Sequence, residues 1–331
     1  METITYDNAP IWADVPLTEK QPRSIDKTLQ VEFNGSKQQV RICAADASAP
    51  PVLVIQAGPG FPTLHEVRKF QRKLALERKL TVFYWDQRGC GAAKKQDAEN
   101  VSFQQQVNDV RAFIRWANEN SGQKVTLLSV SLGSTFSIIA AEQEQDKVKA
   151  LIAISPDINL ADMDASVAAF LSERAASMPR PGRFISNLKK LGDPPYLDPA
   201  LLQLRARLLT DSGAIESGKS FAAAAVEFLF GLVRAYGPIG AVAALRNMNV
   251  VQRRLLSELA ERNVLTDLPP LDFPVHCVLG GKDPLVPTAA RERLADLPGY
   301  SVTNIPEAGH MAHFDHPDIV SSIVLRAAGR D

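Results

Sequence analysis

The sequence predicts an α/β fold in which a mostly parallel sheet carries helices on both faces. Short apolar, β-branched runs alternate with longer segments of helical periodicity between about residues 50 and 155. This alternation is typical of parallel strands joined by crossover helices. It stops after Pro156 and resumes at Phe273, which indicates that a long segment is inserted into the sheet.

The first predicted elements are a hairpin followed by a series of strands and helices. Strand-like residues 28–33 and 38–44 flank Asn34-Gly35, a pair that strongly favours a hairpin turn. The elements predicted after the hairpin are strands at 52–56, 80–85, 124–130 and 150–155, and helices at 64–78, 103–118 and 131–141. They account for the first part of one sheet.

Residues 158–268 predict a helical cap inserted into the sheet domain. The segment is rich in Ala, Leu and Arg and contains Gly- and Pro-rich breaks. Its most apolar run, residues 221–245, contains Glu227 and is broken at Gly237-Pro238, so it favours two buried or pocket-lining helices over a membrane span. We therefore expect an α/β core formed by residues 1–157 and 269–331, with the cap between them.

The composition is that of an ordinary globular protein. The chain has 331 residues, 45% of them hydrophobic, and Lys+Arg equals Asp+Glu at 37 each. The chain therefore has no excess of basic residues that would indicate nucleic acid or an anionic membrane as a partner. Three scattered cysteines predict no disulfide framework, and the N-terminus lacks the apolar run of a secretion signal. We expect a cytoplasmic protein, and its oligomeric state stays open.

Ser131 lies at an abrupt junction between a predicted strand and a predicted helix. The run Ser129-Val130-Ser131-Leu132-Gly133 approximates the Gly-x-Ser-x-Gly pattern, with Ser129 in place of the first glycine. Such a turn holds a serine hydroxyl clear of the sheet, where it can act as a nucleophile. Taken alone, the pentapeptide is more typical of a helix N-cap, so the rest of the chain must decide.

Two later loops supply the other members of a Ser-His-Asp triad. Asp283 follows the predicted strand 275–281, and His310 follows the predicted strand 300–305. The order Ser, Asp, His, each after its own strand, is that of the α/β-hydrolase fold. In such a site Ser131 attacks a carbonyl carbon, His310 transfers the proton, and Asp283 fixes the imidazole tautomer.

Acyl transfer also needs amide donors for the developing oxyanion. The N–H of Leu132, directly after the serine, is one candidate. The second is expected in the loop Gln56-Ala57-Gly58-Pro59-Gly60, whose glycines allow a ligand to approach the backbone. In isolation this loop is equally consistent with a plain glycine-proline turn.

Together these motifs resemble those of α/β-hydrolases related to proline iminopeptidase. The matching pieces are Gln56-Ala57-Gly58-Pro59-Gly60, Asp86-Gln87-Arg88-Gly89-Cys90-Gly91, the Ser131 turn, Gly281-Lys282-Asp283 and Gly309-His310. The resemblance implies the α/β-hydrolase fold with a helical cap, Ser131 as nucleophile, Asp283 as acid and His310 as base. It also implies Gly58 and Leu132 as the oxyanion amides, and we expect no cofactor and no metal.

Differences from the family pattern leave the substrate open. The His and Gly that begin the family's first motif are Gln56 and Ala57 here, and the predicted cap contains no Trp. We expect a small apolar ester, amide or short peptide as the substrate. A carboxylesterase or lactonase without peptidase activity is one alternative, and a catalytically idle ligand-binding protein is another.

Three further sets of residues have two interpretations each. Glu227, the only acid in residues 221–233, is a candidate to bind a substrate ammonium group, although an exposed position is the commoner outcome. His313 and His316 would form a metal site with His310, or they mark the start of a helix, which is favoured. We interpret Asp86 and Arg88 as a scaffold that could pair and brace the site.

Overall fold

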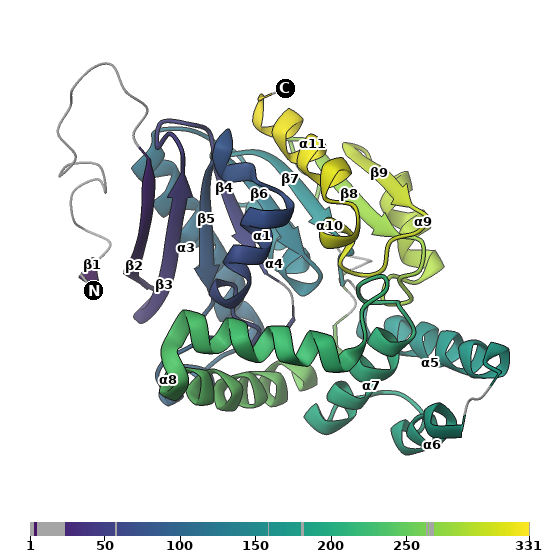
Figure 1. Cartoon of the computed structure of the whole chain (residues 1–331). Coiled ribbons are helices and arrows are strands. Elements are labelled where there is room, and N and C mark those ends of the chain that lie inside the picture. The colour runs from purple at the N-terminus through teal and green to yellow at the C-terminus, as the bar shows by residue number, and fades with distance from the viewer. Residues whose placement is uncertain are drawn as a thin grey trace.

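The computed structural model describes residues 3–4, 24–56, 58–157, 159–179, 182–262, 264 and 268–330. These residues form a nine-stranded sheet in the order β1-β2-β3-β5-β4-β6-β7-β8-β9 (Figure 1). β3 is antiparallel to β2 and to β5, and the other neighbouring strands are parallel. The strands are β1 (Thr3–Ile4), β2 (Ile25–Phe33), β3 (Ser36–Ala44), β4 (Pro51–Ile55), β5 (Thr81–Asp86), β6 (Val125–Val130), β7 (Val148–Ile154), β8 (Val275–Gly280) and β9 (Tyr300–Ile305).

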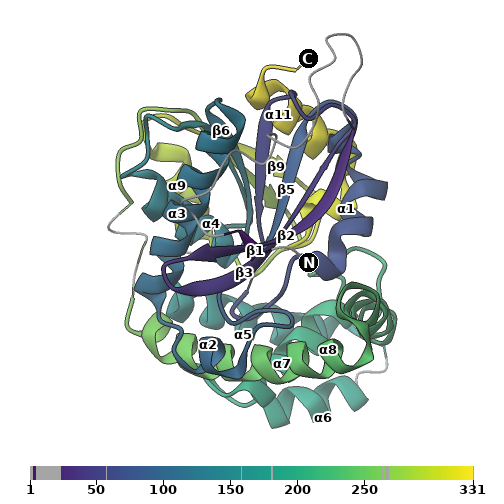
Figure 2. The same cartoon turned by 90° about the vertical axis from the view of Figure 1, so that its left-hand side faces the viewer.

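Helices cover both faces of the sheet, as predicted (Figure 2). One buried cluster joins the sheet to α3, α4 and α9, and a second joins it to α1, α10 and α11. The helices outside the inserted segment are η1 (Leu64–Glu66), α1 (Val67–Lys73), η2 (Leu76–Arg78), α2 (Lys95–Glu99), α3 (Phe103–Ser121), α4 (Leu132–Ala141), α9 (Thr288–Asp296), α10 (Ala312–Asp315) and α11 (Pro317–Ala328).

Local sequence accounts for the predicted hairpin. Asn34 and Gly35 have φ values of 49° and 77°, the left-handed conformation that a two-residue turn between β2 and β3 requires. The central strands β4, β5 and β6 are buried along their whole length, which reflects helices on both faces. The predicted strands are therefore confirmed.

One predicted helix is interrupted. The periodicity of residues 64–78 predicts a single helix, but the structure divides this region into η1, α1 and η2. The break lies at Ala75, whose φ of 50° is left-handed and ends the helical hydrogen-bond series. The apolar spacing continues across the break because both pieces pack on the same face of the sheet.

Among the described residues, four helices lie between β7 and β8, and we call these helices and the loops that join them the helical segment. They are α5 (Leu160–Ser177), α6 (Gly182–Leu191), α7 (Pro199–Asp211) and α8 (Phe221–Ala260). Figure 1 shows them gathered beyond one end of the sheet. Asn159, Asp198 and Ser220 cap α5, α7 and α8 with their side chains.

The apolar run in α8 is broken as expected but is less buried than expected. Gly237, with φ 71° and ψ 172°, is non-helical and precedes Pro238, so two helices meet there. Phe230, Ile239 and Val242 are 66%, 89% and 69% exposed, so the expectation of buried helices is wrong at these residues, and the alternative that they line a pocket stays a prediction. By length and composition, α8 is the one helix in the described residues that could cross a membrane, and 22% of its most apolar window is buried.

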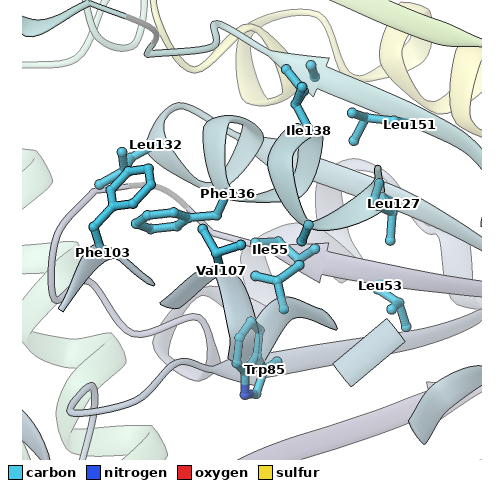
Figure 3. Close-up of a cluster of buried hydrophobic side chains, with 14 of the residues drawn as sticks. Leu53, Ile55, Trp85, Phe103, Val107, Leu127, Leu132, Phe136, Ile138 and Leu151 are labelled. Carbon is cyan, nitrogen blue, oxygen red and sulfur yellow. The ribbon is translucent and has the colours of Figure 1, made fainter. Parts of the chain in front are cut away.

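The helix that follows Ser131 is anchored in the core. Figure 3 shows Leu132 beside Phe103, with Phe136 of the same helix turned toward them. Phe103 and Phe136 form an edge-to-face pair with ring centroids 5.2 Å apart. This packing fixes the start of α4, and with it the position of Ser131.

Candidate active site

Ser131 has a backbone conformation that is unusual for a residue with a side chain. Its φ and ψ are 51° and −126°, whereas N-cap residues normally lie in the extended region. Its side chain makes no capping hydrogen bond to α4. The N-cap interpretation is therefore wrong for this hydroxyl, and strain of this kind is typical of functional sites.

The residues on either side of Ser131 explain why the turn is possible. A Cβ at Gly133 would lie 2.5 Å from the carbonyl oxygen of Ile55, so only glycine fits there. Ser129 is fully buried, and its hydroxyl hydrogen-bonds to that of Ser137 at 2.7 Å. A serine with a local partner is thus accommodated where the common pattern has glycine.

Asp283 and His310 are in direct contact. Asp283 Oδ2 lies 2.9 Å from His310 Nδ1, and these residues are 4% and 5% exposed. The other carboxylate oxygen accepts the N–H of Leu285 at 2.9 Å, which fixes the carboxylate plane. With Nδ1–H donating to Asp283, Nε2 of the neutral ring is left as the proton acceptor.

The loops that hold Asp283 and His310 pack backbone against backbone. A Cβ at Gly280 would lie 2.1 Å from the carbonyl oxygen of Gly309, and one at Gly281 would lie 2.5 Å from that of Pro306. Both glycines are therefore required by the close approach of the two loops. This close packing explains why two glycines, Gly280 and Gly281, precede Lys282-Asp283 in the sequence.

Arg291 braces the Asp283 loop and was not singled out from the sequence. Its guanidinium donates to the carbonyl oxygens of Gly280 at 2.7 Å, Asp283 at 2.9 Å and Val286 at 2.9 Å. Partial burial lowers the pKa of Arg291, while the Asp283 carboxylate opposes that shift. In the sequence, nothing distinguishes this arginine of α9 from an exposed one.

The two predicted oxyanion amides lie at loop and helix starts. Gly58 has φ 70°, and a Cβ there would lie 2.8 Å from the Phe61 ring, so the position requires glycine. Leu132 begins α4, where amides have no intrahelical partner, and its side chain is 1% exposed in the core. Ala57 lies outside the described residues. The joint role of Gly58 and Leu132 stays a prediction.

Asp86 and Arg88 act as scaffold, but they do not pair with each other. Arg88 Nε lies 2.7 Å from Asp109. Asp86 accepts the N–H groups of Thr63 at 2.7 Å and Leu64 at 2.9 Å and the hydroxyl of Tyr236 at 2.6 Å. Burial raises the pKa of Asp86, and these hydrogen bonds oppose the shift. Through Tyr236, Asp86 connects the core to α8.

Glu227 has two lysine partners. Its carboxylate is bonded to Lys219 and lies 3.6 Å from the Lys69 amino group, and the side chain is 40% exposed. Partial burial opposes ionisation, yet the two lysines lower the pKa of Glu227 overall. Because the two lysines already compensate its charge, the Glu227 carboxylate would attract a substrate ammonium group less strongly.

Asp157 is a carboxylate that the sequence interpretation missed. It follows β7, between the strands that precede Ser131 and Asp283, and its main-chain oxygen accepts a hydrogen bond from Thr135 of α4. Among the described residues, no hydrogen bond or ion pair to its carboxyl group is present. Burial raises the pKa of Asp157 to about 6, against the opposing influence of Arg205 and His310. The available signal was an acid directly after a strand, in Ser155-Pro156-Asp157.

Arg205 links this region to the helical segment. The Arg205 guanidinium pairs with Asp164, which is fully buried and also accepts the N–H of Tyr196 at 2.8 Å. Both Arg205 and Asp164 influence the ionisation of Asp157. A separate cleft of about 470 Å³ is lined by residues of the helical segment and by two residues beside Asp283: Phe170, Arg174, Ser212, Gly213, Ser217, Gly218, Gly281 and Lys282.

The two histidines after His310 begin helices. His313 lies in α10, and His316 immediately precedes α11. His313 is fully buried, stacks on Phe70 with ring centroids 5.3 Å apart, and has a pKa that burial lowers well below its usual value. In the part of the chain that the structure describes, no three His, Cys, Asp or Glu side chains could jointly hold a metal ion.

Comparison with curated proteins identifies relatives with peptidase names. The probable aminopeptidase YbaC of Bacillus subtilis is 24% identical over 321 residues, covering 94% of this chain and 98% of that protein. A proline iminopeptidase of Thermoplasma volcanium is 26% identical over 122 residues, covering 37% of this chain and 40% of that protein.

Solved structures show the same fold at low sequence identity. A proline iminopeptidase-related protein from Thermus thermophilus matches with a TM-score of 0.60 and 21% identity, over 92% of this chain and 98% of that one. The proline iminopeptidase of Mycobacterium smegmatis gives a TM-score of 0.63 and 16% identity, over 91% and 99%. The model of the alpha/beta hydrolase fold family matches residues 50–317. Because this match spans most of the chain, the chain belongs to the α/β-hydrolase fold family.

Proposed function

We propose that this protein is a serine hydrolase that forms an acyl-enzyme on Ser131. The observation that carries the proposal is the strained, uncapped conformation of Ser131 on a strand-to-helix turn. The 2.9 Å contact between Asp283 and His310 supports it, because it leaves Nε2 of the ring free to accept a proton. A ligand-binding protein without catalysis has no need of this arrangement.

The mechanism follows from these roles. Ser131 Oγ attacks the substrate carbonyl carbon while His310 Nε2 takes its proton, and Asp283 stabilises the resulting imidazolium. The amides of Gly58 and Leu132 receive the oxyanion. The imidazolium then protonates the leaving group, and water, activated by His310, hydrolyses the acyl-enzyme. The helical segment acts as a cap over this site.

We propose that the substrate carries a free amino group, as in a short peptide or an amino acid amide. The peptidase names of the curated relatives support this class. An ammonium group in a partly apolar site requires a carboxylate partner. Asp157 is the better candidate, because it has no ion-pair partner among the described residues, whereas Glu227 is compensated by two lysines.

A matched pair of variants tests the substrate class. We expect Asp157→Asn to raise KM for aminoacyl p-nitroanilides and to leave KM for their N-acetylated counterparts unchanged. Glu227→Gln is the control and should affect both substrates alike or neither. If instead only Glu227→Gln raised KM, and only for the free-amine substrates, Glu227 and not Asp157 would be the amine-binding residue.

The second candidate is a carboxylesterase or lactonase without peptidase activity. The observation that favours it is that Glu227, the acid in the apolar part of the helical segment, is paired with two lysines. This carboxylate is then not available to bind a substrate ammonium group, which an esterase does not require. Hydrolysis of p-nitrophenyl esters but of no free-amine substrate would establish this alternative. Failure of a fluorophosphonate probe to label Ser131 would instead favour an idle binding protein.

A further inference from the structure

A short piece of the helical segment contacts the loop that holds His310. We call residues 214–217, which lie between α7 and α8, the strap. The main-chain N–H of His310 donates to the carbonyl oxygen of Ala214 at 2.8 Å, and that of Met311 donates to Ile215 at 2.8 Å. The backbone of His310 is therefore hydrogen-bonded to the helical segment, while its side chain contacts Asp283 of the core.

The side chain of Asp315 connects the same two pieces of chain. Its Oδ1 accepts the N–H of Ser217 in the strap at 2.8 Å, and its Oδ2 accepts the N–H of Gly309 at 2.8 Å. Hydrogen bonds to a carboxylate are stronger than those between neutral groups. Because Gly309 directly precedes His310, Asp315 holds the backbone beside the proposed base.

Lys69 of α1 holds the strap from a second direction. Its amino group donates to Glu216 at 2.7 Å and lies 3.9 Å from the centroid of the Phe314 ring. The Lys69 side chain is 9% exposed, so this contact is screened little by solvent. The strap is thus fixed to the core at Lys69, at Asp315 and along the His310 loop.

We propose that Asp315 is a positioning residue for His310, and that it makes the placement of the base depend on the helical segment. The inference rests on the proposed function, in which His310 accepts the proton of Ser131. Asp315 acts through the amides of Gly309 and Ser217. Loss of one of these bonds shifts the His310 loop, and a displacement of about 1 Å can lower catalysis on the order of a hundred-fold.

The test compares two acidic residues that are close in sequence. Asp315→Asn keeps the side-chain shape but turns an NH₂ group toward one of the two N–H donors. We expect it to lower kcat for p-nitrophenyl acetate by roughly ten- to a hundred-fold, with KM nearly unchanged. Asp318→Asn alters an exposed acid in the first turn of α11 and should leave both constants at wild-type values.

A spectroscopic readout separates positioning from general stability. The chain has five histidines, so the His310 Nδ1 proton can be assigned in NMR spectra by its loss in His310→Ala. We expect Asp315→Asn to shift or broaden this signal at temperatures where the variant is folded. An unchanged signal and an unchanged kcat, even with a lower Tm, would overturn the proposal.

Asp315→Glu keeps the charge and serves as the second variant. Its kcat should lie between those of the wild type and Asp315→Asn, and if Asp315→Asn does not fold, the same two readouts are applied to Asp315→Glu. Failure of the proposed function is recognised separately. In that case His310→Ala would retain hydrolysis, whatever the result with Asp315→Asn.

Discussion

At the scale of single residues, Ser131 stores backbone strain that its neighbours must offset. A non-glycine residue with φ 51° and ψ −126° costs about 1–3 kcal/mol relative to relaxed backbone. The N–H of Ser131 donates to the carbonyl oxygen of Ile154 at 2.8 Å, and the buried start of α4 follows directly. These contacts hold the hydroxyl in place before any substrate arrives.

Ser131→Ala should abolish hydrolysis while leaving the protein folded. Loss of the nucleophile in a serine triad lowers kcat by about a million-fold. Steady-state kinetics with a p-nitrophenyl ester, together with circular dichroism, measures both properties. Ser129→Ala is the control, and if it were the variant that lost activity, the assignment of the nucleophile would move by two residues.

Asp283→Asn should keep the fold and impair the base. An amide in place of the carboxylate disfavours the tautomer in which Nε2 of His310 accepts a proton, and the corresponding change in a serine protease lowers kcat by about ten-thousand-fold. Asp296→Asn, an exposed acid at the end of α9, is the control for a charge change nearby. Wild-type kcat in Asp283→Asn would point to another carboxylate.

The ionisation of Asp157 predicts a pH dependence that depends on the substrate. Burial raises the pKa of Asp157 to about 6, so the carboxyl is charged above that pH and neutral below it. A substrate α-amine, with a pKa of about 8, stays protonated throughout. KM for free-amine substrates should therefore rise as the pH falls from about 7 to about 5.

N-acetylated substrates provide the comparison for this effect. Their KM should not change over the same range, and Asp157→Asn should remove the difference between the two substrate types. Parallel pH profiles for both substrates in the wild-type protein would exclude Asp157 as the amine ligand. An effect of His310 on turnover should be the same for both substrates, so it does not alter the difference between their KM profiles.

At the scale of elements, apolar periodicity and turn residues predicted most of the sheet. The hairpin at Asn34-Gly35 and the buried strands before Ser131 and Asp283 are specified locally, by turn chemistry and by runs of β-branched residues. The break at Ala75 could not be predicted, because alanine favours helix and the interruption serves packing on the sheet. Tertiary contacts override local preference there.

Gly280→Ala should separate the loops that hold Asp283 and His310. The added methyl group would lie 2.1 Å from the Gly309 carbonyl oxygen, so one loop must move. We expect a loss of stability of about 1–3 kcal/mol or more, as for overpacked cores, with a fall in kcat. Thermal unfolding and ester hydrolysis measure the two effects.

Gly182→Ala is the matched control for this substitution. A Cβ at Gly182, at the start of α6, would meet no atom within 4 Å. Replacing a helical glycine in open space lowers the entropy of the unfolded chain, so stability should be unchanged or slightly higher. A fully active and equally stable Gly280→Ala variant would mean that the two loops are not in close contact in solution.

At the scale of the whole molecule, the sequence predicts a triad but not the residues that brace it. Ser131, Asp283 and His310 are predicted because each follows a strand and their order matches a known fold. Asp157 also follows a strand but belongs to no motif, and Arg291 and Asp315 have no such local pattern. The bonds of Arg291 and Asp315 depend on carbonyl and amide groups that the fold brings close.

The insertion between β7 and β8 has a consequence for how this fold can diversify. The two strands pair directly although residues 155–274 separate them in sequence. The entropy lost in closing a long loop grows only with the logarithm of its length, about 0.6 kcal/mol for each doubling. Lengthening or exchanging the helical segment therefore costs the sheet little. Selection can therefore change the helical segment almost independently of the sheet, provided that the few bonds from the strap to the His310 loop are kept.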